Sequence, residues 1–113
     1  MPNFSAPANS RVTMKVRVDK RPYLAGFQTP PDNSNWENIA PDGDGVGESR
    51  EFMMPAAKGD TVSFNGQYDT QIGPNDPDPK ATYMITFSSG GSDKVVVSKG
   101  NGPIAREYTF TAN

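Results

Sequence analysis

The fold is decided by residues 58–70, KGDTVSFNGQYDT. Val62 and Phe64 alternate here with hydroxyl residues, which predicts a strand with one apolar and one polar face. Asn65 and Gly66 then provide the two residues of positive φ that a type I′ turn requires. The stretch is therefore expected to form a β-hairpin that sets the register of the strands around it.

Composition favours a single loop-rich β domain. The chain has 113 residues, with 11 Gly and 11 Pro that suit turns and would break a helical bundle. Its 11 basic and 13 acidic residues give a net charge of −2, which argues against nucleic acid, whose binding depends on cationic contacts. The chain has neither Cys nor His, and so it lacks the usual zinc ligands and nucleophile–base pairs.

The clearest further strand is residues 11–18, in which four apolar residues alternate with four polar ones. Its cationic side is expected to be a solvated outer face that discourages pairing with other chains, the alternative being contact with an anionic partner. Four later stretches have strand character: residues 48–54, 81–87, 94–99 and 106–111.

About seven short strands joined by Gly, Pro, Asn and Asp loops predict an all-β fold. A single antiparallel β-sandwich of immunoglobulin-like or jelly-roll-like type fits best, and a small β-barrel is the alternative. Successive hairpins favour largely local strand pairing. The domain is expected to span residues 11–113, preceded by an extended N-terminal arm of residues 1–10, with the longest irregular region at residues 19–47.

The candidate ligand-binding residues surround the only Trp of the chain: Trp36, Asn35, Glu37, Asn38 and Tyr23. A sugar site needs an aromatic face that stacks on the ring, together with amides and carboxylates that bond to its hydroxyl groups. The alternative is a Trp that folds back over one end of the core. The sequence leaves both interpretations open.

The candidate metal ligands are carboxylates in two polar stretches: Asp42, Asp44, Glu48, Asp76 and Asp78. Ca²⁺ takes several oxygen ligands, which a Gly-rich acidic loop can provide. The EF-hand pattern fails at Val46, where Asp or Asn is required, and ordinary solvent-facing turns have the same composition. Ca²⁺ is therefore the one cofactor that the sequence suggests.

An enzyme is not expected. Glycoside hydrolysis needs two carboxyl groups at a defined separation, and the spacing of Glu37, Glu48, Glu51 and Glu107 brings no two of them together. Residues 4–12, FSAPANSRV, resemble the opening of the small calcium-dependent fucose/mannose-binding bacterial lectins. Those lectins carry a dense Asp/Asn calcium loop near the C-terminus, where this chain has SKGNGPI at residues 98–104, and we do not assign the chain to that family.

We therefore expect a non-enzymatic, lectin-like carbohydrate-binding module that Ca²⁺ assists. The alternative is a structural or assembly subunit, such as a virion decoration, fibre or filament protein, whose N-terminal arm contacts another subunit. The expected partner is a glycan or another subunit, including a second copy, with no nucleic acid and no membrane span. The first residues lack the features of a signal peptide, which predicts cytoplasmic synthesis, with release or display on an extracellular particle as a further option.

Overall fold

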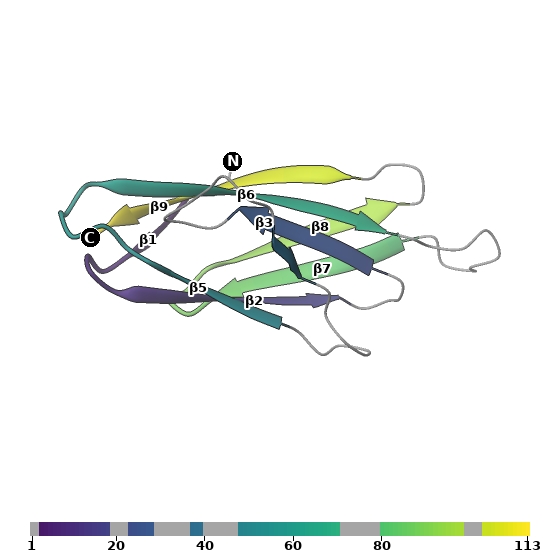
Figure 1. Ribbon diagram of the computed structural model, residues 1–113, viewed down its shortest axis with the longest axis horizontal. Helices are drawn as coiled ribbons and strands as arrows, with labels where there is room; N and C mark the ends of the chain where they lie inside the picture. Colours follow the sequence, from purple (N-terminus) through teal and green to yellow (C-terminus); the bar gives the residue numbers. More distant parts are fainter. Residues whose placement is uncertain (1–2, 19–22, 29–36, 40–47, 71–79, 99–102) are drawn as a thin grey trace.

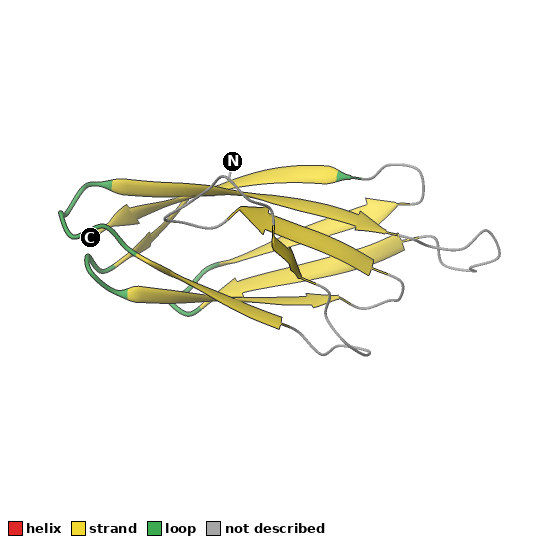
Figure 2. Cartoon of the chain, viewed as in Figure 1, coloured by secondary structure: helices red, strands yellow, loops and turns green. Residues whose placement is uncertain are grey.

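The computed structural model describes residues 3–18, 23–28, 37–39, 48–70, 80–98 and 103–113. These residues form two β-sheets that pack face to face, and the predicted all-β sandwich is therefore confirmed in place of the barrel alternative (Figure 1, Figure 2). Nine strands are described: β1 (Asn3–Ala6), β2 (Arg11–Val18), β3 (Tyr23–Gln28), β4 (Glu37–Ile39), β5 (Glu48–Met53), β6 (Thr61–Thr70), β7 (Lys80–Phe87), β8 (Ser92–Ser98) and β9 (Ile104–Ala112).

The strand order shows that most pairing is between strands distant in the sequence. The five-stranded sheet has the order β1-β9-β6-β3-β4, and the four-stranded sheet has the order β5-β2-β7-β8. Among the strands that the structure describes, only the pairs β3–β4 and β7–β8 join strands that follow one another along the chain. The expectation of largely local pairing is therefore wrong, because most connections lead from one sheet to the other.

The expected hairpin at Asn65 and Gly66 is not formed. Instead, β6 continues through both residues and pairs with β3 on one side and β9 on the other, with Gly66 opposite Phe27 and Arg106. A Cβ on Gly66 would lie only 2.9 Å from Phe27 Cε1 and 3.1 Å from Tyr108 Cε2. Gly66 is required for close aromatic packing, and this requirement and the two strand partners override its turn preference.

The core consists of the inward residues of both sheets. The apolar residues of β2 at positions 12, 14, 16 and 18 are all buried, as their alternation predicts. In β5, Phe52 is buried while Met53 is 51% exposed. Phe52 also packs at ring-centroid distances of 5.2 Å from Phe64 and 5.0 Å from Phe110, so aromatic contacts join the sheets. Burial of each such ring stabilises the fold by roughly 1.5–3 kcal/mol.

The N-terminal residues take part in this architecture. Strand β1 pairs with β9 in parallel, from Asn3 opposite Thr109 to Ala6 opposite Ala112, whereas the other described strand pairs are antiparallel. Residues 3–6 thus form one edge of the five-stranded sheet.

Candidate functional site

Three of the five predicted ligand-binding residues lie on neighbouring strands at the other edge of the five-stranded sheet. Tyr23 begins β3, and Glu37 and Asn38 begin β4. The register places Glu37 opposite Phe27 and Asn38 opposite Gly26. Asn35 and Trp36 lie outside the described residues, although Trp36 directly precedes β4 in the sequence. Strand β4 falls within the region that the sequence predicted to be irregular.

The predicted calcium ligands fall mostly outside the described ranges: Asp42, Asp44, Asp76 and Asp78. Glu48 is the first residue of β5 and pairs with Val16 in the four-stranded sheet. Within the part of the chain that the structure describes, no three His, Cys, Asp or Glu residues gather in a way that could hold a metal ion. The calcium site therefore stays a prediction.

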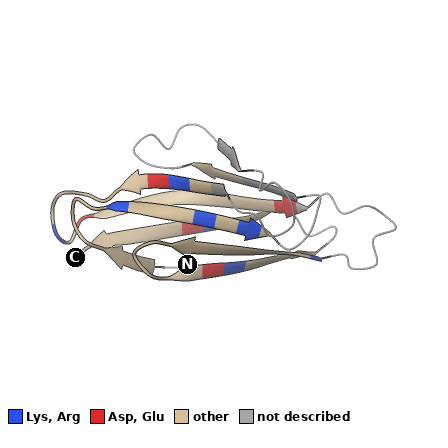
Figure 3. Ribbon diagram, turned by 90° about the horizontal axis from the view of Figure 1, so that it is seen from below, with Lys and Arg blue, Asp and Glu red and all other residues tan. Residues whose placement is uncertain are grey.

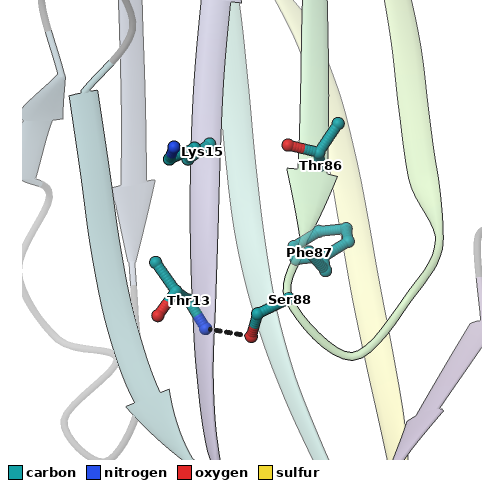
Figure 4. Close-up of a pocket in the computed structure, with 5 residues that line it drawn as sticks. All are labelled: Thr13, Lys15, Thr86, Phe87 and Ser88. Carbon is teal, nitrogen blue, oxygen red and sulfur yellow. Dashed lines mark hydrogen bonds between the residues drawn. The ribbon is translucent and has the colours of Figure 1, made fainter.

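A shallow hollow of about 270 Å³ lies on the outer face of the four-stranded sheet (Figure 4). It is lined by Thr13, Lys15, Thr86, Phe87 and Ser88. Lys15 and Thr86 are opposite one another in the β2–β7 register, and both side chains are exposed. The Thr13 backbone amide donates a hydrogen bond to Ser88 Oγ over 2.9 Å, which ties the β7–β8 turn to β2. The hollow thus presents an ammonium group beside hydroxyl groups.

The outward positions around this hollow are mainly cationic. Exposed cations on the described strands of this sheet are Arg11, Lys15, Arg17, Lys80 and Lys94. An exposed carboxylate on the same face is Glu51, whose Oε2 lies 3.4 Å from Arg11 Nη1. Figure 3 shows the molecule from the side of this sheet, with Lys and Arg in blue. Such exposed ion pairs contribute little to stability, so the charges chiefly shape the surface potential of this face.

A buried polar network joins the two sheets at the β8–β9 side. The Tyr108 hydroxyl donates to Asp93 Oδ2 over 2.8 Å, and the hydroxyl oxygens of Tyr68 and Tyr108 lie 2.5 Å apart. Because Tyr108 gives its only hydroxyl proton to Asp93, Tyr68 must donate to Tyr108. Arg106 Nε lies 3.5 Å from Asp93 Oδ2 and is buried without a hydrogen-bond partner. The network therefore connects β6 and β9 of one sheet to β8 of the other.

This environment raises the pKa of both tyrosines. Burial is the main cause for Tyr68, and the nearby Asp93 carboxylate adds to it while the hydrogen bond to Tyr108 opposes it. Burial is again the main cause for Tyr108, followed by the neighbouring Tyr68 and the hydrogen bonds to Tyr68 and Asp93. Both hydroxyls therefore stay protonated at neutral pH and act as hydrogen-bond donors that hold the sheets together.

The sequence did not single out this network as a unit. Residues 106–111 have strand character in the sequence, but nothing there assigns roles to Tyr108, Asp93 or Arg106. The sequence does contain a signal for Asp93, because this residue lies on the same face of β8 as the buried Val95 and Val97. A carboxylate at an inward position of a strand requires a partner, since an unpaired buried charge is costly.

Comparison of the chain with protein-family models, with curated proteins and with solved structures finds no match. None of the described residues belongs to a helix long and apolar enough to cross a membrane.

Proposed function

We propose that the protein is a non-enzymatic binding module that takes a carbohydrate at the β3–β4 edge of the five-stranded sheet. The observation that supports this proposal is the β3–β4 pairing, which sets Glu37 and Asn38 opposite Phe27 and Gly26 of β3, the strand that Tyr23 begins. Binding residues that are held by paired strands are positioned more accurately than residues of a free loop. Trp36, next to Glu37 in the sequence, supplies the aromatic face of this site.

Each residue has a distinct role in the proposed site. The Trp36 indole stacks on the C–H face of one sugar, because it presents a broad apolar surface. The Tyr23 ring does the same for a second sugar of a longer glycan, since the β3–β4 register puts Tyr23 four residues from Phe27, the partner of Glu37. Asn35, Glu37 and Asn38 provide amide and carboxylate groups for the sugar hydroxyls. Ca²⁺ assists through carboxylates from the two acidic stretches: Asp42, Asp44, Glu48, Asp76 and Asp78.

The test combines a broad glycan array with titration of the Trp fluorescence, which reports on one position because the chain contains a single Trp. We expect selective binding by the native chain and a fluorescence change on addition of the bound glycan. Trp36→Ala should lose binding, whereas Thr86→Ala, an exposed change on the other sheet, should retain it. Absence of binding across the array, or full binding by Trp36→Ala, would refute the proposal.

The contribution of calcium is tested separately by repeating the titration with a chelator. We expect weaker glycan binding without Ca²⁺, and we expect Asp42→Asn combined with Asp44→Asn to reproduce that loss when Ca²⁺ is present. If the chelator leaves glycan binding unchanged, the carbohydrate proposal stands but Ca²⁺ has no part in it. Recovery of the glycan unaltered after incubation would support a binding role without catalysis.

A second candidate function is assembly into a larger structure through the N-terminus. The observation that favours it is β1, a strand of only four residues that forms one edge of its sheet through a parallel pairing with β9. Size-exclusion chromatography with light scattering should then show an assembly that depends on residues 3–6. A monodisperse monomer at every concentration tested would contradict this second function.

A further inference from the structure

We propose that β1 is exchangeable between copies of this chain, so that β9 of one copy accepts the β1 strand of a second copy. This inference deepens the second candidate function, assembly through the N-terminus, and identifies the partner as another copy of the same chain. It is independent of carbohydrate binding. Three features of the described residues support it: a specific seat for one side chain, limited attachment of β1, and a strained connection to β2.

The Phe4 ring packs in a recess formed by Phe87, Gly91 and Phe110, which we call the Phe4 seat. Its centroid lies 4.9 Å from that of Phe87 and 5.1 Å from that of Phe110, and these two rings come from opposite sheets. Gly91 completes the seat, because a Cβ at that position would lie only 2.6 Å from Phe4 Cδ1. The edge of the sandwich therefore has a shaped recess that recognises one aromatic side chain at one register.

The attachment of β1 to the rest of the fold is limited. Its four residues pair with β9 alone, opposite Thr109–Ala112, and parallel pairing is slightly weaker per residue than antiparallel pairing. The preceding part of β9, residues 104–108, has no described strand on that side. An incoming strand that pairs with this part of β9 would be bound before the resident strand leaves.

The connection to β2 is a tight turn at residues 7–10. Asn9 has a φ of 62°, the left-handed conformation that Asn tolerates better than most side chains. The Ser10 backbone amide and Oγ both bond to the Pro7 carbonyl oxygen, at 3.2 and 2.6 Å. If this turn opens, β1 can make its other contacts on a second copy. The free-energy difference between the closed monomer and the exchanged form is therefore concentrated in the turn. Short strained connections favour such exchange.

The experiment uses full-length chains and exploits the absence of Cys. Ser5 and Thr111 are register partners on the solvent-facing side of β1 and β9, and neighbouring strands lie at a distance that a disulfide can span. One chain carries Ser5→Cys, and a second chain with a different tag carries Thr111→Cys. We expect mild oxidation of the mixture to give a mixed disulfide dimer several times more abundant than in a control mixture of Ser5→Cys with Val96→Cys.

Two further variants test the mechanism. Phe4→Ala added to the Ser5→Cys chain should reduce the mixed dimer to the control level, because the exchanged strand loses its anchor. Asn9→Val should increase the mixed dimer, since a β-branched residue disfavours the turn, whereas Asn9→Gly should decrease it. A native mixture that gives no more cross-linking than the control, or cross-linking that Phe4→Ala leaves unchanged, would overturn the proposal. Large assemblies seen by light scattering without this cross-link would mean that the second function uses another surface.

Discussion

Gly66 shows how one residue can be essential to a strand rather than to a turn. The structure leaves no room for a side chain there, because Phe27, Tyr68 and Tyr108 crowd the position at 2.9–3.1 Å from a Cβ. The Tyr68 atom in that contact is the hydroxyl oxygen of the buried network. A change at Gly66 should therefore disturb both the aromatic packing and the polar bridge between the sheets.

We predict that Gly66→Ala lowers the free energy of unfolding by about 1–3 kcal/mol, the usual cost of overpacking a core. Urea denaturation followed by fluorescence measures it. Gln67→Ala is the matched control, because Gln67 is the exposed neighbour in the same strand and should change stability by less than about 0.5 kcal/mol. Equal effects of the two substitutions would show that the lack of a Cβ at Gly66 is not what matters.

Removing either tyrosine hydroxyl of the network should lower stability, and the two substitutions should differ in the size of the effect. Tyr108→Phe leaves the Tyr68 hydroxyl without its acceptor and also removes the hydroxyl donor to Asp93, which keeps the Lys94 amide and the Arg106 side chain as neighbours. Tyr68→Phe removes only the donor to Tyr108. An unsatisfied buried polar group costs about 1–3 kcal/mol. We therefore expect Tyr108→Phe to be the more destabilising change in thermal or urea unfolding. The reverse order would mean that the Tyr108–Asp93 hydrogen bond contributes less to stability than the Tyr68–Tyr108 bond.

At the scale of elements, the β7–β8 turn and β1 depend on one another through Gly91. Gly90 and Gly91 have φ values of 92° and 105°, so Ala at either position strains the backbone. A Cβ at Gly90 would meet open space, whereas one at Gly91 would collide with Phe4. Comparing Ala variants at the two glycines therefore distinguishes strain in the turn from loss of the Phe4 contact that holds β1.

We predict that Gly91→Ala, unlike Gly90→Ala, releases β1 from β9. Hydrogen exchange is the measurement, because the amides that join β1 to the C-terminal end of the chain, such as the Asn113 amide that donates to the Ala6 carbonyl oxygen, should lose protection only in the Gly91 variant. Both variants should lower stability through the turn, so stability alone does not distinguish them. Similar exchange at β1 in the two variants would show that the Phe4 seat does not hold this strand.

Alternation and turn preference are both local signals in the sequence, and this explains which elements could be predicted and which one could not. Alternation shows which residues of a strand point inward, and it correctly predicted the apolar face of β2. It could not show that residues 58–70 contain one long strand, because the turn preference of Asn65 and Gly66 is local. The competing requirement comes from Phe27 and Tyr108, which reach Gly66 from other strands.

At the scale of the whole molecule, the fold class could be predicted from the sequence, but the strand order could not. Sheet order depends on pairs such as β2–β5 and β6–β9, whose partners are distant in the chain and carry no local signature. The candidate site was only partly predictable for a similar reason. Its residue types suggested a sugar site, but the pairing of Glu37 and Asn38 with Phe27 and Gly26 of β3 follows from the sheet. The Tyr68–Tyr108–Asp93 network follows from stacking two sheets.

The same network predicts how the stability of the molecule depends on alkaline pH. Tyrosine in an unfolded chain has a pKa of about 10, and burial raises the folded-state pKa of Tyr68 and Tyr108 well above that value. The folded state therefore holds these protons more tightly than the unfolded state does. Their contribution to stability is complete below about pH 10 and is lost as the pH rises further, at up to about 1.4 kcal/mol per pH unit for each tyrosine.

Urea denaturation at several values from about pH 8 to about pH 11 measures this dependence. We expect stability to fall steeply only above about pH 10, with tyrosinate absorbance from these two residues appearing together with unfolding. The double variant Tyr68→Phe with Tyr108→Phe should start from a lower stability and decline less steeply over the same range. If the native chain shows the same slope as the double variant, the two hydroxyls do not ionise with unfolding, and the protonated bridge between the sheets would not be what limits alkaline stability.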